Sequence, residues 1–290
     1  MKRKIKIGSR ESKLAVVQAE IVMDSIRRFD SSIELELITM KTTGDKILDR
    51  TLDKIGGKGL FVKELEQALL DERIDLCVHS FKDMQIEENP LLPIIALSKR
   101  EDARDVEIFS LDGKNKENII GSSSARRAIQ LKELHENIEV KSIRGNVLTR
   151  LEKLDRGEFS SVVLAYAGIK RLGLEKRISR IFSTDEILPA SCQGILAVQG
   201  RKDEDYEYLN LFDDANSHFV SATEREFVKA LGFGCSSPVA AYAECHGDEL
   251  KLNGFYFDEK TNQTYRGSIS GSKMQAKQLG ERLAKKLMSI

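Results

Sequence analysis

Cysteine is scarce in this chain, and its spacing excludes the usual metal and redox motifs. The four copies are Cys77, Cys192, Cys235 and Cys245. They form no C-x-x-C pair, which argues against a zinc ribbon and against a redox dithiol. Cys77 and His79 alternate in one apolar run and Cys245 precedes His246, but two ligands fall short of a tetrahedral site. We therefore expect no metal centre.

Excess charge and long apolar runs are also missing. The 46 basic and 46 acidic side chains cancel, which argues against bulk attraction to nucleic acid or to a membrane. No window approaches the ~20 apolar residues needed to span a bilayer, and residues 1–17 show no export signal. We expect a cytoplasmic protein with reduced thiols, no nucleic-acid or membrane partner, and charge recognition that is only local.

Strand and helix patterns alternate in the first third of the chain. The expected elements are strands at 5–9, 33–40 and 74–80, a helix after residue 12, and a second helix at 60–70 that follows a Gly/Lys-rich loop at 41–59. In the first helix the residues expected on one amphipathic face are Leu14, Val17, Ile21, Ser25 and Phe29. This order favours a mostly parallel sheet with helices on both faces.

The same alternation restarts further along and then changes. The expected elements are strands at 118–124, 138–143 and 161–168, helices at 124–134 and 146–157, and a return crossing at 188–201. Asn146 should cap its helix and Gly157 should stop it. From about residue 216, a helix, two alternating segments and a C-terminal helix predict a small α+β domain after two α/β domains.

Basic side chains follow three successive strands of the second α/β domain. Residues 121–127, GSSSARR, place hydroxyls and two arginines where a helix begins, which is a natural anion site. Arg144 and Arg150 follow the next strand, and Lys170 and Arg171 follow the third. Ligands of doubly wound sheets bind at the carboxyl ends of the strands, so we expect these cations to converge. The alternative is that they are solvated surface charges.

One carboxylate stands out in the first domain. Asp83 ends the segment VHSFKD at 78–83, next to Lys82, while Arg10 and Ser12 follow the first strand. A carboxylate among cations can transfer protons and can stabilise a cationic intermediate. The alternative is a turn or cap residue. We expect His79 itself to be a core or hydrogen-bonded histidine.

Cys235 lies in the loop LGFGCSSP at 231–238, directly after an expected helix. By composition alone it is either a small buried hydrophobe or a reactive thiol.

These segments together resemble the porphobilinogen deaminase family, also called hydroxymethylbilane synthases. The motifs that carry the resemblance, in order, are GDKILDRTLDKIGGKGLFVKELEQALL, VHSFKD, GSSSARRAIQL, RGNVLTRLEKLDRGEF, AGIKRLGLE and LPASCQG. The resemblance extends from about Ile5 through the cysteine loop and more weakly to the C-terminus.

The resemblance implies an α/β fold with two periplasmic-binding-protein-like domains, a smaller α+β C-terminal domain, and an active site between the first two. The expected boundaries are 1–97 with about 193–213, then 98–192, then 214–290. It also implies a monomeric transferase that joins four porphobilinogen molecules head to tail, releases ammonia and yields hydroxymethylbilane. The family carries a dipyrromethane cofactor bound by a thioether, here through Cys235.

The resemblance further assigns roles to individual residues. Asp83 matches the catalytic aspartate. The residues expected to bind cofactor and substrate are Arg10, Ser12, Ser80, Lys82, Ser122, Ser123, Ser124, Arg126, Arg127, Arg144, Gly145, Arg150 and Arg171. The residues expected in a mobile loop are Lys54, Gly57 and Lys58. Each porphobilinogen adds an acetate and a propionate, which explains why many cations are needed.

The chain also departs from the family pattern. The departures are Phe81 for Met, Met84 and Gln85 for Val-Pro, Cys192 for Gly, and Ser236 and Ser237 for Gln-Val. A rival from another class is a non-catalytic two-domain anion- or carboxylate-binding protein. It would explain the arginines without Asp83 or Cys235, and it predicts reversible binding with no covalent chromophore.

Overall fold

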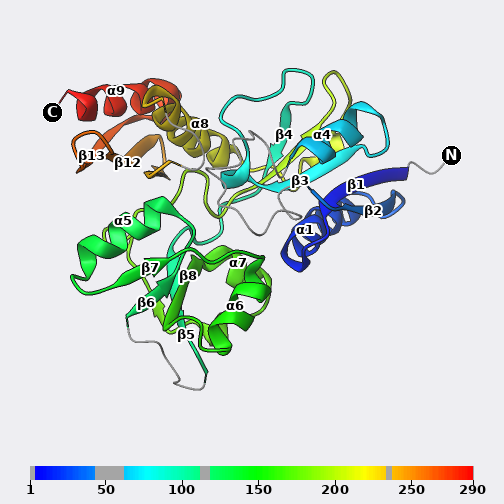
Figure 1. The fold of residues 1–290 in the computed structure, drawn as a ribbon. Coiled ribbons are helices and arrows are strands. Elements are labelled where there is room, and N and C mark those ends of the chain that lie inside the picture. The colour runs from blue at the N-terminus through cyan, green and yellow to red at the C-terminus, as the bar shows by residue number, and fades with distance from the viewer. Residues whose placement is uncertain (1–3, 43–61, 112–117, 233–236, 290) are drawn as a thin grey trace. The chain divides into compact units, whose positions relative to one another are not determined.

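The fold is taken from a computed structural model that describes residues 4–42, 62–111, 118–232 and 237–289 (Figure 1). The chain divides into two compact units: Met1–Glu101 with Ile195–His218, and Asp102–Gly194 with Phe219–Ile290. Each unit is described separately below. Because residues 219–290 group with residues 102–194, the division into three domains stays a prediction.

The first unit contains a five-stranded sheet with the order β2-β1-β3-β10-β4. Its elements are β1 (Lys4–Arg10), α1 (Lys13–Phe29), β2 (Glu34–Met40), α4 (Lys63–Leu70), β3 (Leu76–Ser80), η1 (Phe81–Asp83), β4 (Ile94–Leu97), β10 (Leu196–Gly200) and η3 (Glu207–Leu209). Strand β1 runs parallel to β2 and β3, whereas β10 runs antiparallel to β3 and β4. The return crossing predicted at 188–201 is therefore confirmed, while β4 was not predicted.

Alternating side chains of β3 place one helix on each face of this sheet. Leu76 and Val78 pack into the core that contains Val22 of α1. Cys77 packs instead into the core that contains Leu65 of α4. Successive strand residues point to opposite faces, so α1 and α4 cover opposite faces of the sheet.

The helix α1 is confirmed, but its expected apolar face is confirmed only in part, because Ser25 is buried while Ile21 and Phe29 are not. The buried face contains Ala15, Ala19, Val22 and Ile26. Ile21 and Phe29 are exposed instead. Both sets have helical spacing, and the small side chains of Ala15 and Ala19 let the helix lie close to the sheet. Val22 and Ile26 fill the core on the same face, while Ile21 and Phe29 lie on the exposed side.

The second unit begins with another five-stranded sheet, of order β7-β6-β8-β5-β9 (Figure 1). Its elements are β5 (Asp105–Phe109), β6 (Ile119–Gly121), α5 (Ala125–Leu134), β7 (Glu139–Lys141), α6 (Val147–Asp155), β8 (Ser161–Ala165), α7 (Tyr166–Arg171), η2 (Glu175–Arg177) and β9 (Arg180–Ile181). Strand β6 is parallel to β7 and β8, and β5 is antiparallel to β8 and β9. The carboxyl ends of β6, β7 and β8 thus share one edge, as predicted.

Alternating residues of β8 again separate the covering helices. Val163 packs with Leu131 of α5, whereas Val162 packs with Leu151 of α6. The predicted helix ends are confirmed, since the Asn146 side chain accepts from the Thr149 amide at 3.0 Å and Gly157 has φ +76°. Strand β5 was not predicted.

The end of the chain forms a three-stranded antiparallel sheet, β11-β12-β13, with two helices. Its elements are α8 (Ala215–Ala230), β11 (Val239–His246), β12 (Glu249–Asp258), β13 (Gln263–Ser272), η4 (Lys273–Gln275) and α9 (Ala276–Met288). A Cβ at Gly254 would lie 2.5 Å from Phe227 of α8, so glycine lets this helix approach the sheet closely. Phe255 packs instead with Leu188 of the α/β part. The predicted fold class, two α/β parts and a smaller α+β part, is confirmed.

Candidate functional site

In the first unit, the predicted site residues meet at one edge of the sheet. Parallel pairing of β1 and β3 brings Arg10 and Ser80 to the same edge. The buried Gln18 of α1 donates from Nε2 to Ser80 Oγ at 2.8 Å. Asp83 follows Ser80 after a single turn of 3-10 helix and is exposed, while Lys82 is half-buried.

The turn that carries Asp83 is anchored by the two apolar residues beside it. Phe81 and Met84 are both buried. The Phe81 amide donates to the Ile195 carbonyl at 3.0 Å, and the Met84 amide donates to the Phe81 carbonyl at 3.1 Å. These backbone hydrogen bonds and the burial of the two side chains therefore hold the turn, while the Asp83 carboxylate stays accessible.

Behind this turn lies a buried pair that carries no charge near neutral pH. Cys77 Sγ and His79 Nε2 are 2.9 Å apart. Burial lowers the pKa of His79 to about 4, opposed by a hydrogen bond with Gln199 and aided by the charge of Arg10. Burial also raises the pKa of the Cys77 thiol, and the charge of Glu66 adds to this. His79 is thus the buried, hydrogen-bonded histidine that we expected.

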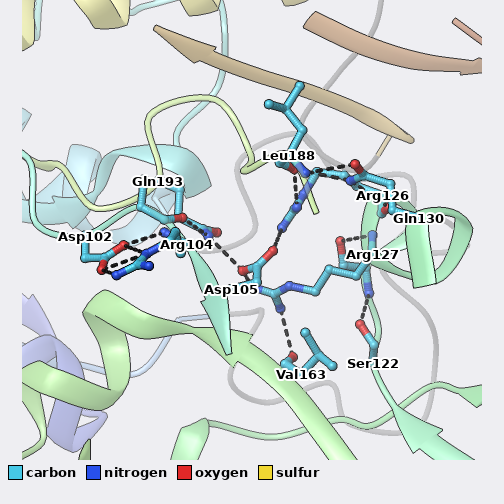
Figure 2. Close-up of polar contacts among 12 residues, drawn as sticks. Asp102, Arg104, Asp105, Ser122, Arg126, Arg127, Gln130, Val163, Leu188 and Gln193 are labelled. Atoms are coloured by element: carbon cyan, nitrogen blue, oxygen red, sulfur yellow. Dashed lines mark hydrogen bonds and ion pairs between the residues drawn. The ribbon is translucent and has the colours of Figure 1, made fainter. Parts of the chain in front are cut away.

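The centre of the second unit is a buried ion cluster, which we call the Asp105 cluster: Asp105, Arg126, Arg127 and Gln193 (Figure 2). Arg126 Nη2 lies 2.7 Å from Asp105 Oδ2, and Arg127 Nη2 lies 2.7 Å from Oδ1. Gln193 Nε2 donates to Asp105 Oδ1 at 2.8 Å. Asp105 is 0% exposed, and the two arginines are 3% and 6% exposed.

Each arginine of the Asp105 cluster is also tied to the backbone (Figure 2). Arg126 Nη1 donates to the Leu188 carbonyl at 2.6 Å, and Arg127 Nη1 donates to the Val163 carbonyl at 3.1 Å. Gln130 holds the same Leu188 residue through both its carbonyl and its amide, at 3.2 and 2.9 Å. Both guanidinium groups are therefore fixed at two ends.

The Asp105 cluster contains two guanidinium groups but only one carboxylate, so one positive charge is not neutralised. Burial alone would raise the pKa of Asp105, but the charges of Arg126 and Arg127 outweigh it and hold this pKa well below its usual range. Burial lowers the pKa of Arg126, although the charge of Asp105 opposes this. With both arginines ionised and one carboxylate, the buried net charge is about +1. Such a charge is costly unless an anion accompanies it.

The three predicted serines after β6 also have structural partners. Ser124 caps α5 by accepting from the Arg127 amide at 3.4 Å, and Ser122 Oγ accepts from the Ser124 amide at 3.3 Å. Ser123 Oγ donates to the Ile143 carbonyl at 2.6 Å and accepts from its amide at 3.1 Å. In the first unit, Ser12 likewise caps α1 through the Ala15 amide at 3.3 Å.

The remaining predicted arginines of this unit are half-buried: Arg144, Arg150 and Arg171. Arg150 Nε donates to the Gly145 carbonyl at 2.9 Å, and Arg171 Nη2 donates to the Gly194 carbonyl at 2.7 Å. Gly145 has φ +112°, a conformation that side chains disfavour. Lys54, Gly57, Lys58, Cys235 and Ser236 lie outside the described residues.

Cys192, which replaces the usual glycine, is buried with φ +61°. Its amide donates to Glu224 Oε2 at 2.6 Å, while Glu224 Oε1 accepts from the Ala243 amide at 2.7 Å. The buried carboxylate of Glu224 thus joins the loop before β10 to the C-terminal sheet. Neither this contact nor the positive φ was predicted.

Sequence reasoning missed four polar residues around the predicted site: Gln18, Asp105, Gln193 and Glu224. One of them left a usable signal. Two adjacent arginines require a counter-ion where they are buried, and Asp105 directly precedes the segment VEIF. Gln18, Gln193 and Glu224 stand in helix or loop patterns that give no comparable signal.

The described residues contain no group of three or more His, Cys, Asp or Glu side chains arranged to hold a metal ion. None of the helices in these ranges combines the length and apolar character of a bilayer-spanning segment.

The chain matches known proteins along almost its whole length. Residues 5–208 match the family model of the porphobilinogen deaminase dipyromethane cofactor binding domain, and residues 219–289 match that of the porphobilinogen deaminase C-terminal domain. Porphobilinogen deaminase of Ruminiclostridium josui is 58% identical, covering 99% of this chain and 98% of the relative. That of Acetivibrio thermocellus is also 58% identical, covering 98% of each. The solved methionine-binding protein MetQ is 13% identical with a TM-score of 0.42, over 77% of this chain and 91% of that one. This chain belongs to the porphobilinogen deaminase family.

Proposed function

We propose that this chain is a transferase of tetrapyrrole biosynthesis that joins four porphobilinogen molecules head to tail and releases hydroxymethylbilane. The observation that carries the proposal is the pair of family matches, which together span residues 5–208 and 219–289. In each step the C–N bond of the substrate's aminomethyl group breaks and ammonia leaves. A C–C bond forms between that methylene carbon and the free α-carbon of the growing chain's last pyrrole, which loses its hydrogen as a proton. Water finally cleaves the finished tetrapyrrole from the cofactor and supplies the hydroxyl of hydroxymethylbilane. The rival anion-binding receptor has no comparable support.

The cofactor in this proposal is a dipyrromethane joined by a thioether to Cys235. The donor set of the second unit fits such a group, because a dipyrromethane carries several carboxylates. The Asp105 cluster has an excess positive charge, and Arg127 Nε is buried without a hydrogen-bond partner among the described residues. The half-buried Arg144, Arg150 and Arg171 add further cations. When bound, the cofactor supplies the pyrrole carbon to which the first substrate is joined.

The residues of this chain then have separate tasks. Asp83, an exposed carboxylate on an anchored turn, holds or moves a proton and stabilises positive charge that develops on the substrate as ammonia leaves. The arginines bind acetate and propionate groups, for which the planar guanidinium is suited. Binding residues proposed beside them are Arg10, Ser12, Ser80, Lys82, Ser122, Ser123, Ser124 and Gly145, with Lys54, Gly57 and Lys58 in a loop over the substrate.

Intact mass of the denatured, purified protein tests this proposal. We expect a mass above that of the bare sequence by one dipyrromethane, a positive reaction with Ehrlich's reagent, and conversion of porphobilinogen to hydroxymethylbilane. Cys235→Ser should have the bare sequence mass and no activity, because a hydroxyl is a far weaker nucleophile than a thiolate. A wild-type protein of bare mass that binds carboxylates reversibly would instead support the receptor.

We also propose the organisation that the family resemblance implies. It has three domains, at 1–97 with about 193–213, at 98–192 and at 214–290, and the protein acts as a cytoplasmic monomer. Light scattering coupled to gel filtration tests the monomer, since a dimer would give twice the 32.6 kDa of the chain. Limited proteolysis tests the domain boundaries, because cleavage concentrates in exposed linkers.

A further inference from the structure

The two arginines of the Asp105 cluster belong to one helix, but what fixes them belongs to other elements. Arg126 and Arg127 lie in the first turn of α5. Asp105 is the first residue of β5 and pairs with Ala165 of β8. The Asp105 carbonyl also accepts from the Phe182 amide at 3.0 Å. The carboxylate is therefore held by the sheet, and it sets where the two guanidinium groups lie.

The geometry leaves little freedom for either arginine to turn away. Both carboxylate oxygens of Asp105 are used, one by each arginine, at 2.7 Å. The second terminal nitrogen of each arginine donates to a backbone carbonyl, at Leu188 or Val163. A rotamer change would break two buried hydrogen bonds, one of them to a charged group. An incoming carboxylate would therefore be bound beside Asp105 and would not displace it.

We propose that Asp105 is a positioning residue that holds Arg126 and Arg127 ready for ligand carboxylates and neutralises one of their two charges beforehand. The proposal rests on the proposed function, because it takes the cofactor and substrate acids as the ligands. The cluster keeps one unneutralised charge, and the buried Arg127 Nε lacks a hydrogen-bond partner among the described residues. One ligand carboxylate can satisfy both. Asp105 thus leaves one positive charge in the cluster, which a single ligand carboxylate can neutralise.

The first experiment compares Asp105→Asn with and without the cofactor. The Cys235→Ser background supplies the cofactor-free protein, and the intact mass verifies each form. In the cofactor-free form we expect Asp105→Asn to lower Tm by about 10 °C, because two buried charges lose their counter-ion. In the loaded form we expect at most half that loss, because the bound ligand carboxylates still neutralise part of the charge of the two guanidinium groups. An equal loss in both forms would overturn the proposal.

Asp155→Asn is the matched control. Asp155 binds Arg177 with both oxygens, at 2.6 and 3.1 Å, but these side chains are 32% and 19% exposed. We expect a small Tm loss that is the same in both forms.

A second measurement does not depend on the cofactor. In the Cys235→Ser background, Tm is compared in sodium sulfate and in sodium chloride at equal ionic strength. We expect sulfate to raise the Tm of Asp105→Asn by several degrees more than that of Asp155→Asn, because an external anion bound beside the cluster can neutralise part of the positive charge that the variant leaves. Equal responses would contradict the role of Asp105. If the intact mass shows no dipyrromethane in wild type, the proposed function fails while this test still stands.

Asp105→Glu keeps the charge and guards against a variant that does not fold. The longer side chain should shift both guanidinium groups, and its carboxylate still neutralises one of their two charges. We expect the KM for porphobilinogen to rise about tenfold while kcat falls less, since a charged hydrogen bond to substrate is weakened. Unchanged KM and kcat would show that the exact position of the carboxylate is unimportant.

Discussion

The two five-stranded sheets of this protein hold buried polar groups in opposite charge states. Beneath the turn of Asp83, Cys77 and His79 are buried as uncharged groups, and burial itself shifts both pKa values toward the neutral form. In the Asp105 cluster the carboxylate and the two guanidinium groups are equally buried but stay charged, because each has a partner of opposite sign. Asp83 is left exposed. One carboxylate is thus available for chemistry and the other for structure.

The largest effect should come from removing the exposed carboxylate. We expect Asp83→Asn to lower kcat by at least about 100-fold, the usual range for loss of a general acid or base. Its unfolding free energy should stay within about 0.5 kcal/mol of wild type, because the side chain is exposed. Single-turnover assays and urea unfolding measure the two quantities. Glu87→Gln, at another exposed position, serves as control. A similar fall in kcat there would mean that Asp83 has no special role in the reaction.

A buried charge should show the reverse pattern, with stability affected first. We expect Arg126→Met to lower the unfolding free energy by about 3–5 kcal/mol, the usual cost of breaking a buried ion pair. The double variant with Asp105→Asn should lose less than the sum of the single losses, by about 0.5–3 kcal/mol. Urea unfolding of the four proteins in this cycle measures the difference. Strict additivity would mean that Arg126 and Asp105 do not act as a pair.

The uncharged pair in the first sheet should make stability depend on pH. The pKa of His79 is about 4 when folded against 6.5 as its ordinary value. Between these values the unfolded chain binds more protons, so stability is fully present above pH 6.5 and falls as the pH drops toward 4. The loss should total about 3 kcal/mol. Urea unfolding at a series of pH values gives the unfolding free energy as a function of pH. We expect this free energy to depend less on pH in His79→Gln, while the control His246→Gln, at an exposed position, keeps the wild-type pH dependence.

Much of the fold follows from local sequence pattern. Periodicity and caps predicted the helix after Asn146 and its end at Gly157, because both signals act within a few residues. The parallel strand order predicted that the residues after β6, β7 and β8 share an edge. The buried face of α1 was not predictable in this way. Apolar residues at helical spacing occur on more than one side of α1, and only packing against the sheet decides which side is buried.

The candidate site was predictable in its residue types but not in its contacts. The motifs locate Arg126 and Arg127, whereas their partner Asp105 is more than twenty residues away on a strand that was not predicted. Pairing of this kind depends on tertiary structure. The same holds for Ser123, which bridges to Ile143 on a neighbouring segment. A sequence motif therefore names the groups that gather at a site, while the fold decides how many are already engaged.

The smallest expected effects separate capping from ligand binding at matching serines of the two units. Ser12 caps α1 and Ser124 caps α5, each by accepting a backbone amide hydrogen bond. Replacing either by alanine should cost about 1 kcal/mol of unfolding free energy, whereas asparagine, an equally good cap, should restore it to within a few tenths. The serine hydroxyl can still donate its hydrogen to a carboxylate while its oxygen caps the helix. If the hydroxyl also binds ligand, the asparagine variant will keep its stability and show a raised KM. If the alanine and asparagine variants at one serine have equal unfolding free energies, capping at that serine contributes nothing to stability. A larger loss of unfolding free energy at Ser12 than at Ser124, or the reverse, would show which unit depends more on its cap.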